Sequence, residues 1–347
     1  MSTRFNAATY LAKLINGEFP SRLSSLAGVI LPFATINKLV GQILPLCSGT
    51  AGPDSNTLGN SVQTTVSVSQ YCSDNEYVKR MQQKCQAAIM DGLIDVLIQG
   101  SLGNDEAVAY SDFDAIAVIR RPALESQQVL KRVVRLLYEL RWIMYDMDPL
   151  QHHGWFVITD DMLNHYHESY LPIAVLKHST SLCRSIELNL NAVDQPKEVF
   201  QNQLRSLCSS VERELNTESY VSTWYQCKSF LSKMMLLPSV YLQARYGMCV
   251  FKKESFDLAK RDFAPESWRA IEISSDWRIR WSYSDRRFIS LRRNGSILGR
   301  VARKRLSGRL DAKTRTELCK IKIPAHQFMR EIKQNTAEEV ENGTAVH

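Results

Sequence analysis

Two short apolar runs, separated by a polar loop and followed by a long amphipathic segment, constrain the fold of this chain more than any other feature. The first run, residues 93–98, contains several β-branched side chains and leads into a turn at Gly100. The second run, residues 115–119, stops just before Pro122. Apolar stretches of this length, bounded by turn residues, are typical of buried strands. We therefore expect two buried strands in this part of the chain.

The residues that follow extend these strands into an α/β unit. Residues 129–143 have apolar side chains at helical spacing, and residues 155–159 form a third apolar run. Beyond about residue 160 the apolar spacing becomes mostly helical, most clearly over residues 199–215 and 220–246. Alternating strand and helix patterns favour a mixed α/β class. We predict an α/β (α+β) domain with a short mixed sheet, followed by a mostly helical C-terminal domain.

Changes in composition along the chain divide it into four predicted parts. Residues 1–46 have helical spacing interrupted by prolines, and residues 47–70 are rich in Ser, Thr, Gly and Asn, which predicts a loop or linker. The parts that we predict are an N-terminal helical extension and linker (1–75), an α/β domain (76–192), a helical domain (193–275) and a basic C-terminal segment (276–347).

The overall composition excludes several classes of protein. The chain has 347 residues, of which 44% are hydrophobic and 23% charged, a balance that favours a folded core over disorder or a coiled coil. The most apolar window, residues 26–46, includes Lys38, and a lysine in mid-bilayer costs about 2.5–3.5 kcal/mol. We therefore expect no membrane span. The N-terminus has no basic stretch followed by an apolar run and a cleavage site, so we expect a cytoplasmic location.

Basic residues are concentrated near the C-terminus. Eleven Arg or Lys residues lie between positions 278 and 309, with Asp285 as the one acid among them. The whole chain has a formal net charge of +7, so the remainder is net negative. Two interpretations are open: a solvated tail, or a surface that contacts a polyanion such as RNA, because clustered arginines with interleaved aromatic residues suit phosphate contact and base stacking.

The polar loop between the first two strands carries the candidate chemistry. We expect Asp112 and Asp114 to lie inside the second strand, so that their side chains project from one face, about 7 Å apart at roughly 3.3 Å per residue. Two carboxylates so placed are suited to Mg²⁺ completed by phosphate oxygens and water. At the preceding turn, Gly100 lets the backbone approach a phosphate, and the Ser101 hydroxyl offers a hydrogen bond. Together these residues predict a triphosphate site beside a metal site.

At this point the chain resembles a known family. Residues 99–119, QGSLGNDEAVAYSDFDAIAVI, are similar to the signature of the polymerase-beta-like nucleotidyltransferase superfamily, which has Gly-Ser, a spacer and Asp-x-Asp before apolar residues. The ten-residue spacer is most similar to that of the aminoglycoside adenylyltransferase branch. A second likeness lies at Gly247, followed five residues later by Lys252, with Lys253 beside it.

The resemblance implies an activity: the hydroxyl of an acceptor attacks the α-phosphate of a nucleoside triphosphate, and pyrophosphate leaves. Mg²⁺ or Mn²⁺ would be the cofactor and ATP the expected co-substrate. By the same resemblance, Asp112 and Asp114 would hold the metals and Gly100 and Ser101 would seat the β- and γ-phosphates. Lys252 and Lys253 would contact the nucleotide. The acceptor stays open among a small hydroxylated molecule, a protein side chain and an RNA end.

The chain departs from the family where a third carboxylate is expected on the next strand. His152 and His153 stand there instead of an acid. Imidazole can accept a proton near neutral pH, and we favour His153, since only one of two successive strand residues can face the metals. Asp148 or Glu187 could supply the carboxylate instead. The departure also leaves open a nucleotide- or RNA-binding protein that has lost catalysis.

Overall fold

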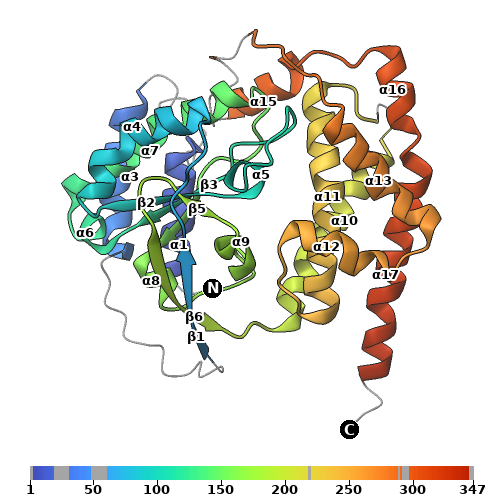
Figure 1. Ribbon diagram of the computed structural model, residues 1–347, viewed down its shortest axis with the longest axis horizontal. Helices are drawn as coiled ribbons and strands as arrows, with labels where there is room; N and C mark the ends of the chain where they lie inside the picture. The colour runs from blue at the N-terminus through green and yellow to red at the C-terminus, as the bar shows by residue number, and fades with distance from the viewer. Residues whose placement is uncertain are drawn as a thin grey trace.

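The computed structural model describes residues 3–18, 31–47, 61–217, 220–287, 290 and 297–343. These residues form two halves (Figure 1). One half contains the described strands with several helices, and the other is helical. The mixed α/β class with a small mixed sheet is thus confirmed.

A four-stranded sheet lies at the centre of the α/β half, in the order β4-β3-β2-β5. β2 runs antiparallel to β3 and β5, whereas β3 and β4 are parallel. Since β2 ends beside the start of β3, the Gln99 N–H donates to the Asp114 carbonyl at 3.0 Å. The turn after β2 and the acidic segment before β3 therefore lie at the same edge. The strands are β2 (Ile94–Ile98), β3 (Ala115–Ile119), β4 (Phe156–Thr159) and β5 (Thr180–Ser181).

Both faces of this sheet are covered, because successive side chains of a strand point to opposite sides. Val96 and Ile98 pack into a core with the larger helices, whereas Leu97 and Ile116 pack on the opposite face. The helices of the first core are α1 (Thr3–Ile15), α3 (Pro32–Cys47), α4 (Glu76–Met90) and α7 (Gln127–Met147), and the short helices are α5 (Gly100–Gly103), α6 (Arg121–Leu124), α8 (Asp160–Leu163) and α9 (Ile173–Lys177).

A two-stranded ribbon corrects the prediction of a loop over residues 47–70. β1 (Ser61–Val68) pairs antiparallel with β6 (Ile186–Val193), and its Val66 and Val68 are buried while the alternate residues are exposed or partly exposed. The prediction was wrong for this stretch because one face of the ribbon stays in solvent, which makes β1 as polar as a linker. Its partner also lies more than a hundred residues away, so no local hairpin signal exists.

The helical half has its own core, which includes Phe230, Trp268 and Phe328. Its longest helix, α11, begins with a capping box in which the Thr223 and Gln226 side chains each bond to the other residue's backbone. α11 continues through Pro238 to Gly247, whose positive φ of 67° ends it. The helices are α10 (Lys197–Leu215), α11 (Trp224–Tyr246), α12 (Lys252–Lys260), α13 (Pro265–Ile279), α16 (Ala312–Cys319) and α17 (Lys322–Gly343).

The basic segment connects the two halves and is not simply a solvated tail. α15 (Ile297–Leu306) lies across the top of the molecule in Figure 1. Arg286 donates to the carbonyl of Asp146 at the end of α7, and buried Arg303 lies 5.3 Å from the Tyr145 ring centroid. Arg292 and Arg293, which contribute to the predicted polyanion surface, lie outside the described residues.

Within the described ranges, every helix is either too short or too polar to cross a membrane.

Candidate functional site

Asp112 and Asp114 lie in the segment that leads into β3 and not, as we predicted, inside the strand, because β3 begins at Ala115. Between them, Phe113 is fully buried, and its N–H donates to Gln151 Oε1 at 2.9 Å. Gln151 Nε2 donates back to the Phe113 carbonyl at 3.0 Å. This reciprocal pair of bonds fixes the backbone between the two aspartates, so their carboxylates are held in place before any ligand arrives.

The predicted glycine turn meets this acidic segment. Gly100 has a φ of +67°, and a Cβ added there would lie 3.3 Å from Asp114 Oδ2. Glycine is therefore needed for its backbone conformation and for the space beside the carboxylate. The Ser101 Oγ donates to Ser111 Oγ at 2.8 Å, so the Ser101 hydroxyl braces the loop between the turn and the aspartates.

A lysine that the sequence analysis missed lies against one of the aspartates. Lys228 Nζ is 2.7 Å from Asp112 Oδ1 and 2.7 Å from Asp148 Oδ2, and its side chain is 0% exposed. It projects from α11, so this contact joins the helical half to the α/β half. A signal existed in the sequence, because Lys228 stands at helical spacing with Leu231 and Met235, where an apolar residue is the norm.

Three carboxylates at the site have shifted pKa values. Burial raises the pKa of Asp114 to about 6, helped by the negative charge of Asp112. Burial also raises the pKa of Asp148 to about 7, against the effect of Lys228. For Asp112, burial acts upward, but the positive charge of Lys228 leads the effects that outweigh it, so the pKa of Asp112 lies well below the usual value. Asp112 is thus the strongest anion of the three.

Of the two alternatives considered for a third carboxylate, Asp148 is the one that the structure brings to the site. It follows α7 and reaches Asp112 through Lys228. Glu187 lies exposed on β6, opposite Ser67 of β1, in the ribbon rather than in the sheet that leads from the aspartates.

The two histidines have different surroundings. β4 lies beside β3, as our argument for His153 requires, although both histidines precede the strand. His153 is exposed, and its charge lowers the pKa of both Asp112 and Asp114, so it lies within electrostatic reach of them. The His152 ring stacks on Tyr225 at 4.9 Å, and burial lowers its pKa to about 3. His152 is therefore neutral and fits a packing role.

Of the two lysines predicted to contact the nucleotide, Lys252 lies within electrostatic reach of the aspartates. Burial and the neighbouring Arg278 lower the pKa of Lys252 to about 8, while Asp114 and Asp112 oppose that shift. Lys252 is the first residue of α12. Lys253 is exposed and pairs with Glu106 on the loop after α5 at 2.5 Å.

The arrangement offers two carboxylates to a metal rather than a complete cage. The described residues contain no group of three or more His, Cys, Asp or Glu side chains arranged to hold a metal ion. Asp114 Oδ1, however, is buried without a hydrogen-bond partner, and such an atom is costly unless a ligand satisfies it. Mg²⁺ commonly takes one or two carboxylates together with water and phosphate oxygens, so the donor set fits such an ion.

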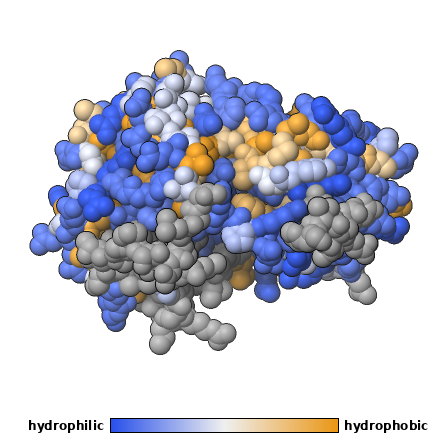
Figure 2. Space-filling model, turned by 90° about the horizontal axis from the view of Figure 1, so that it is seen from below, coloured by the Kyte–Doolittle hydropathy of each residue, from blue (hydrophilic) through white to orange (hydrophobic). Residues whose placement is uncertain are grey.

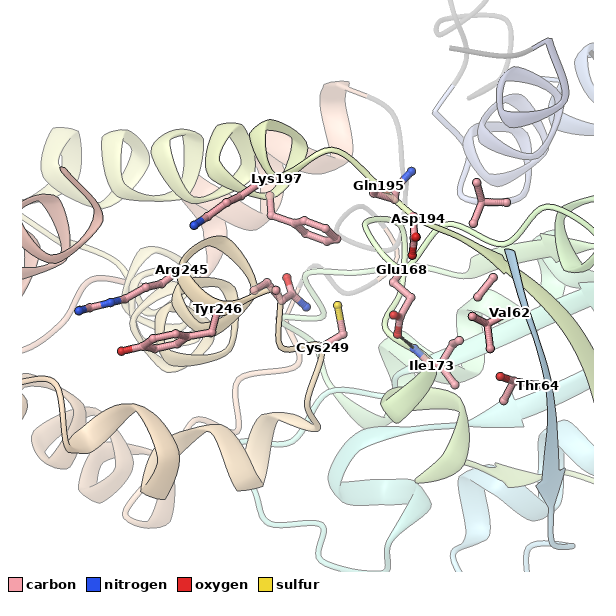
Figure 3. Close-up of a pocket in the computed structure, with 15 residues that line it drawn as sticks. Val62, Thr64, Glu168, Ile173, Asp194, Gln195, Lys197, Arg245, Tyr246 and Cys249 are labelled. Carbon is pink, nitrogen blue, oxygen red and sulfur yellow. Dashed lines mark hydrogen bonds between the residues drawn. The ribbon is translucent and has the colours of Figure 1, made fainter. Parts of the chain in front are cut away.

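A cleft of about 490 Å³ opens between the ribbon and the helical half. Seen from below, hydrophobic residues gather where the two halves meet, on an otherwise mostly hydrophilic surface (Figure 2). Neither Asp112 nor Asp114 lines this cleft. Cys249 of its lining lies three residues before Lys252 in the chain, and the Phe251 ring between them stacks on His178 at 4.3 Å. Its lining includes Val62, Thr64, Glu168, Lys197, Arg245 and Cys249 (Figure 3).

Comparison of this chain with family models, curated proteins and solved structures finds no match in any of the three.

Proposed function

We propose that this chain transfers a nucleotidyl group from a nucleoside triphosphate, with ATP as the first candidate, to a hydroxyl group of an acceptor. The observation that carries the proposal is the convergence of three segments: a Cβ added at Gly100 would lie 3.3 Å from Asp114 Oδ2, Asp112 stands two residues before Asp114, and Lys252 lies within electrostatic reach of both carboxylates. A close backbone approach, two carboxylates and a lysine are the parts that binding of a metal–triphosphate requires.

Mg²⁺ or Mn²⁺ would be held by Asp114 and by the carboxylate oxygen of Asp112 that does not contact Lys228. When bound, the ion supplies charge neutralisation for the phosphates and for the leaving pyrophosphate. Unpaired Asp114 Oδ1 supports this assignment, because it is buried where a ligand would satisfy it.

The chain's own residues provide positioning and a proton acceptor. Gly100 lets the β- and γ-phosphates approach the backbone, and Lys252 balances their negative charge. The acceptor oxygen bonds to the α-phosphorus as the bond to the pyrophosphate oxygen breaks, and the hydroxyl proton passes to a base. His153 is the better candidate for that base, because it is exposed within electrostatic reach of the aspartates while the Asp148 carboxylate already accepts a bond from Lys228.

The acceptor would bind in the cleft between the ribbon and the helical half. A volume of about 490 Å³ suits a small molecule better than a protein surface or an RNA duplex. Glu168 and Asp194 offer negative charge, and Lys197 and Arg245 offer positive charge, so a polar, hydroxylated acceptor is favoured.

A second function, nucleotide binding without turnover, is favoured by one observation. Lys228 already neutralises Asp112 and engages Asp148, which leaves fewer free carboxylate oxygens than two metal ions need.

Turnover separates the two functions. We expect purified protein with α-phosphate-labelled ATP, Mg²⁺ or Mn²⁺ and a small-molecule extract to form a labelled product and pyrophosphate. Asp112→Asn with Asp114→Asn should abolish the transfer and the melting shift that Mg²⁺–ATP produces, because ligand stabilisation disappears with the site. A melting shift without labelled product would favour the binding function. The absence of both, with each nucleoside triphosphate tried, would contradict both functions.

A further inference from the structure

We propose that the ammonium group of Lys228 is the resident cation of the Asp112–Asp148 carboxylate pair, so that the site takes one divalent ion rather than two. The inference rests on the proposed function, because it concerns the ions that nucleotidyl transfer would use. It assigns a positioning residue on α11 that none of the sequence motifs contains.

The geometry places the ammonium where a bridging cation would sit. Nζ contacts one oxygen of Asp112 and one of Asp148, each at 2.7 Å, and all of the lysine side chain is buried. A buried ammonium is stable only where carboxylates compensate its charge, so these contacts account for a lysine in the middle of an apolar helix face.

The surroundings hold the ammonium in position from several sides. Tyr110 OH donates to the carbonyl of Lys228 at 2.9 Å, and Lys228 Nζ lies 5.0 Å from the Tyr110 ring centroid. Asp148 Oδ1 accepts the Leu150 N–H at 3.0 Å, which leaves Oδ2 for the lysine. The ammonium is therefore anchored by both halves of the molecule rather than placed by a mobile side chain.

The ammonium of Lys228 limits which cations Asp112 and Asp148 can bind between them. A divalent ion that bridged Asp112 Oδ1 and Asp148 Oδ2 would need the place between them where the ammonium already contacts both oxygens. A second ion held between Asp112 and Asp148 would need the space between Asp112 Oδ1 and Asp148 Oδ2, which the ammonium of Lys228 occupies. Asp114 and the second oxygen of Asp112 remain, and these suffice for one ion completed by phosphate and water.

The alternative is that Lys228 is only an ion pair between the two halves, with no bearing on metal binding. The two roles differ in one respect. A resident cation can be replaced by another cation, whereas the loss of a purely structural contact cannot be restored by a metal.

The test uses full-length protein and Mn²⁺, counted by electron paramagnetic resonance with and without a non-hydrolysable ATP analogue. We expect one bound Mn²⁺ per parent chain and two per Lys228→Met chain, since the vacated carboxylates then accept a second ion. Without metal, Lys228→Met should melt lower than the parent, and Mn²⁺ should raise its melting temperature by about 3 °C or more beyond the rise seen in the parent. The matched control is Lys233→Met on the same helix, whose lysine pairs with Glu214 at 2.5 Å and is 25% exposed, and it should behave like the parent.

Other results of these measurements would contradict the role of Lys228 as the resident cation. Two Mn²⁺ ions in the parent would overturn the inference, and so would a Lys228→Met chain that melts lower but gains neither an ion nor extra stabilisation from Mn²⁺. If Lys228→Met does not fold, the number of Mn²⁺ ions bound by the parent still tests the inference. A second test is the double variant Lys228→Met with Asp148→Asn. We expect one ion in that double variant, and two ions there would contradict the role of Asp148. One Mn²⁺ in a parent that transfers no nucleotidyl group would count against the proposed function while supporting the assignment of Lys228.

Discussion

Gly100 combines a backbone conformation that favours glycine with a position close to a carboxylate of the site. Its φ is +67°, and a Cβ would lie 3.3 Å from Asp114 Oδ2. We expect Gly100→Ala to lower the free energy of unfolding by about 1 kcal/mol or more, because L residues are disfavoured at positive φ. We also expect it to remove most of the melting shift that Mg²⁺–ATP produces, because the methyl group would displace the carboxylate.

Gly92 provides the matched control for this prediction. Its φ is +69°, yet nothing lies within 4 Å of the position that a Cβ would take. Gly92→Ala should therefore show a similar loss of stability in urea unfolding and keep the full nucleotide shift. Equal nucleotide shifts in the two variants would show that the turn at Gly100 does not approach the ligand.

The sequence predicts the residues of the site unevenly, for physical reasons. Gly100, Asp112 and Asp114 stand close together in the chain and in a recognisable pattern, so their convergence at one sheet edge could be predicted. Lys228 and Asp148 could not be assigned together, because their contact depends on how the two halves dock. Nothing in the local pattern of α11 specifies which element its buried lysine will face.

The helices and strands, like the site residues, were predicted where the signal is local and missed where it depends on contacts distant in the chain. The apolar runs at 93–98, 115–119 and 155–159 correspond to β2, β3 and β4, and the amphipathic stretch at 129–143 lies within α7. These elements are buried enough for periodicity to show. The β1–β6 ribbon was not predicted, because its half-exposed strands resemble a linker and pair across a long stretch of chain.

The buried residues of the ribbon give a prediction at this scale. Val66 of β1 is buried opposite Leu188, whereas Val62 on the same side of the strand is 59% exposed. We expect Val66→Ala to lower the free energy of unfolding by about 1–3 kcal/mol, through lost burial and the cavity it leaves. Val62→Ala should change it by less than about 0.5 kcal/mol. Urea unfolding measures both, and equal effects would mean that β1 does not pack as described.

At the scale of the whole molecule, the basic segment has arginines bound to α7 in one part and exposed basic side chains in another. Exposed Arg286 and buried Arg303 both contact the end of α7, so part of the charge that suggested a polyanion surface joins the two halves instead. Lys304, Arg305 and Arg309, in or near α15, are exposed, and a phosphate contact in this region would depend on them.

Variants of the exposed and of the buried basic residues should therefore have different effects, the first on RNA binding and the second on stability. If the exposed group binds RNA, the affinity of the parent should fall with salt, with a log–log slope of about −0.7 for each neutralised phosphate on a single strand. Replacing Lys304, Arg305 and Arg309 by Gln should reduce the magnitude of that slope by about 2 and leave the melting temperature nearly unchanged. Arg303→Gln should do the reverse, because Arg303 is 5% exposed against the Tyr145 ring and its loss removes packing between the halves. Fluorescence anisotropy with single-stranded RNA at several salt concentrations, with melting curves of each variant, checks both expectations. An equal slope in the triple variant and the parent, or no binding by the parent at low salt, would limit the segment to joining the two halves.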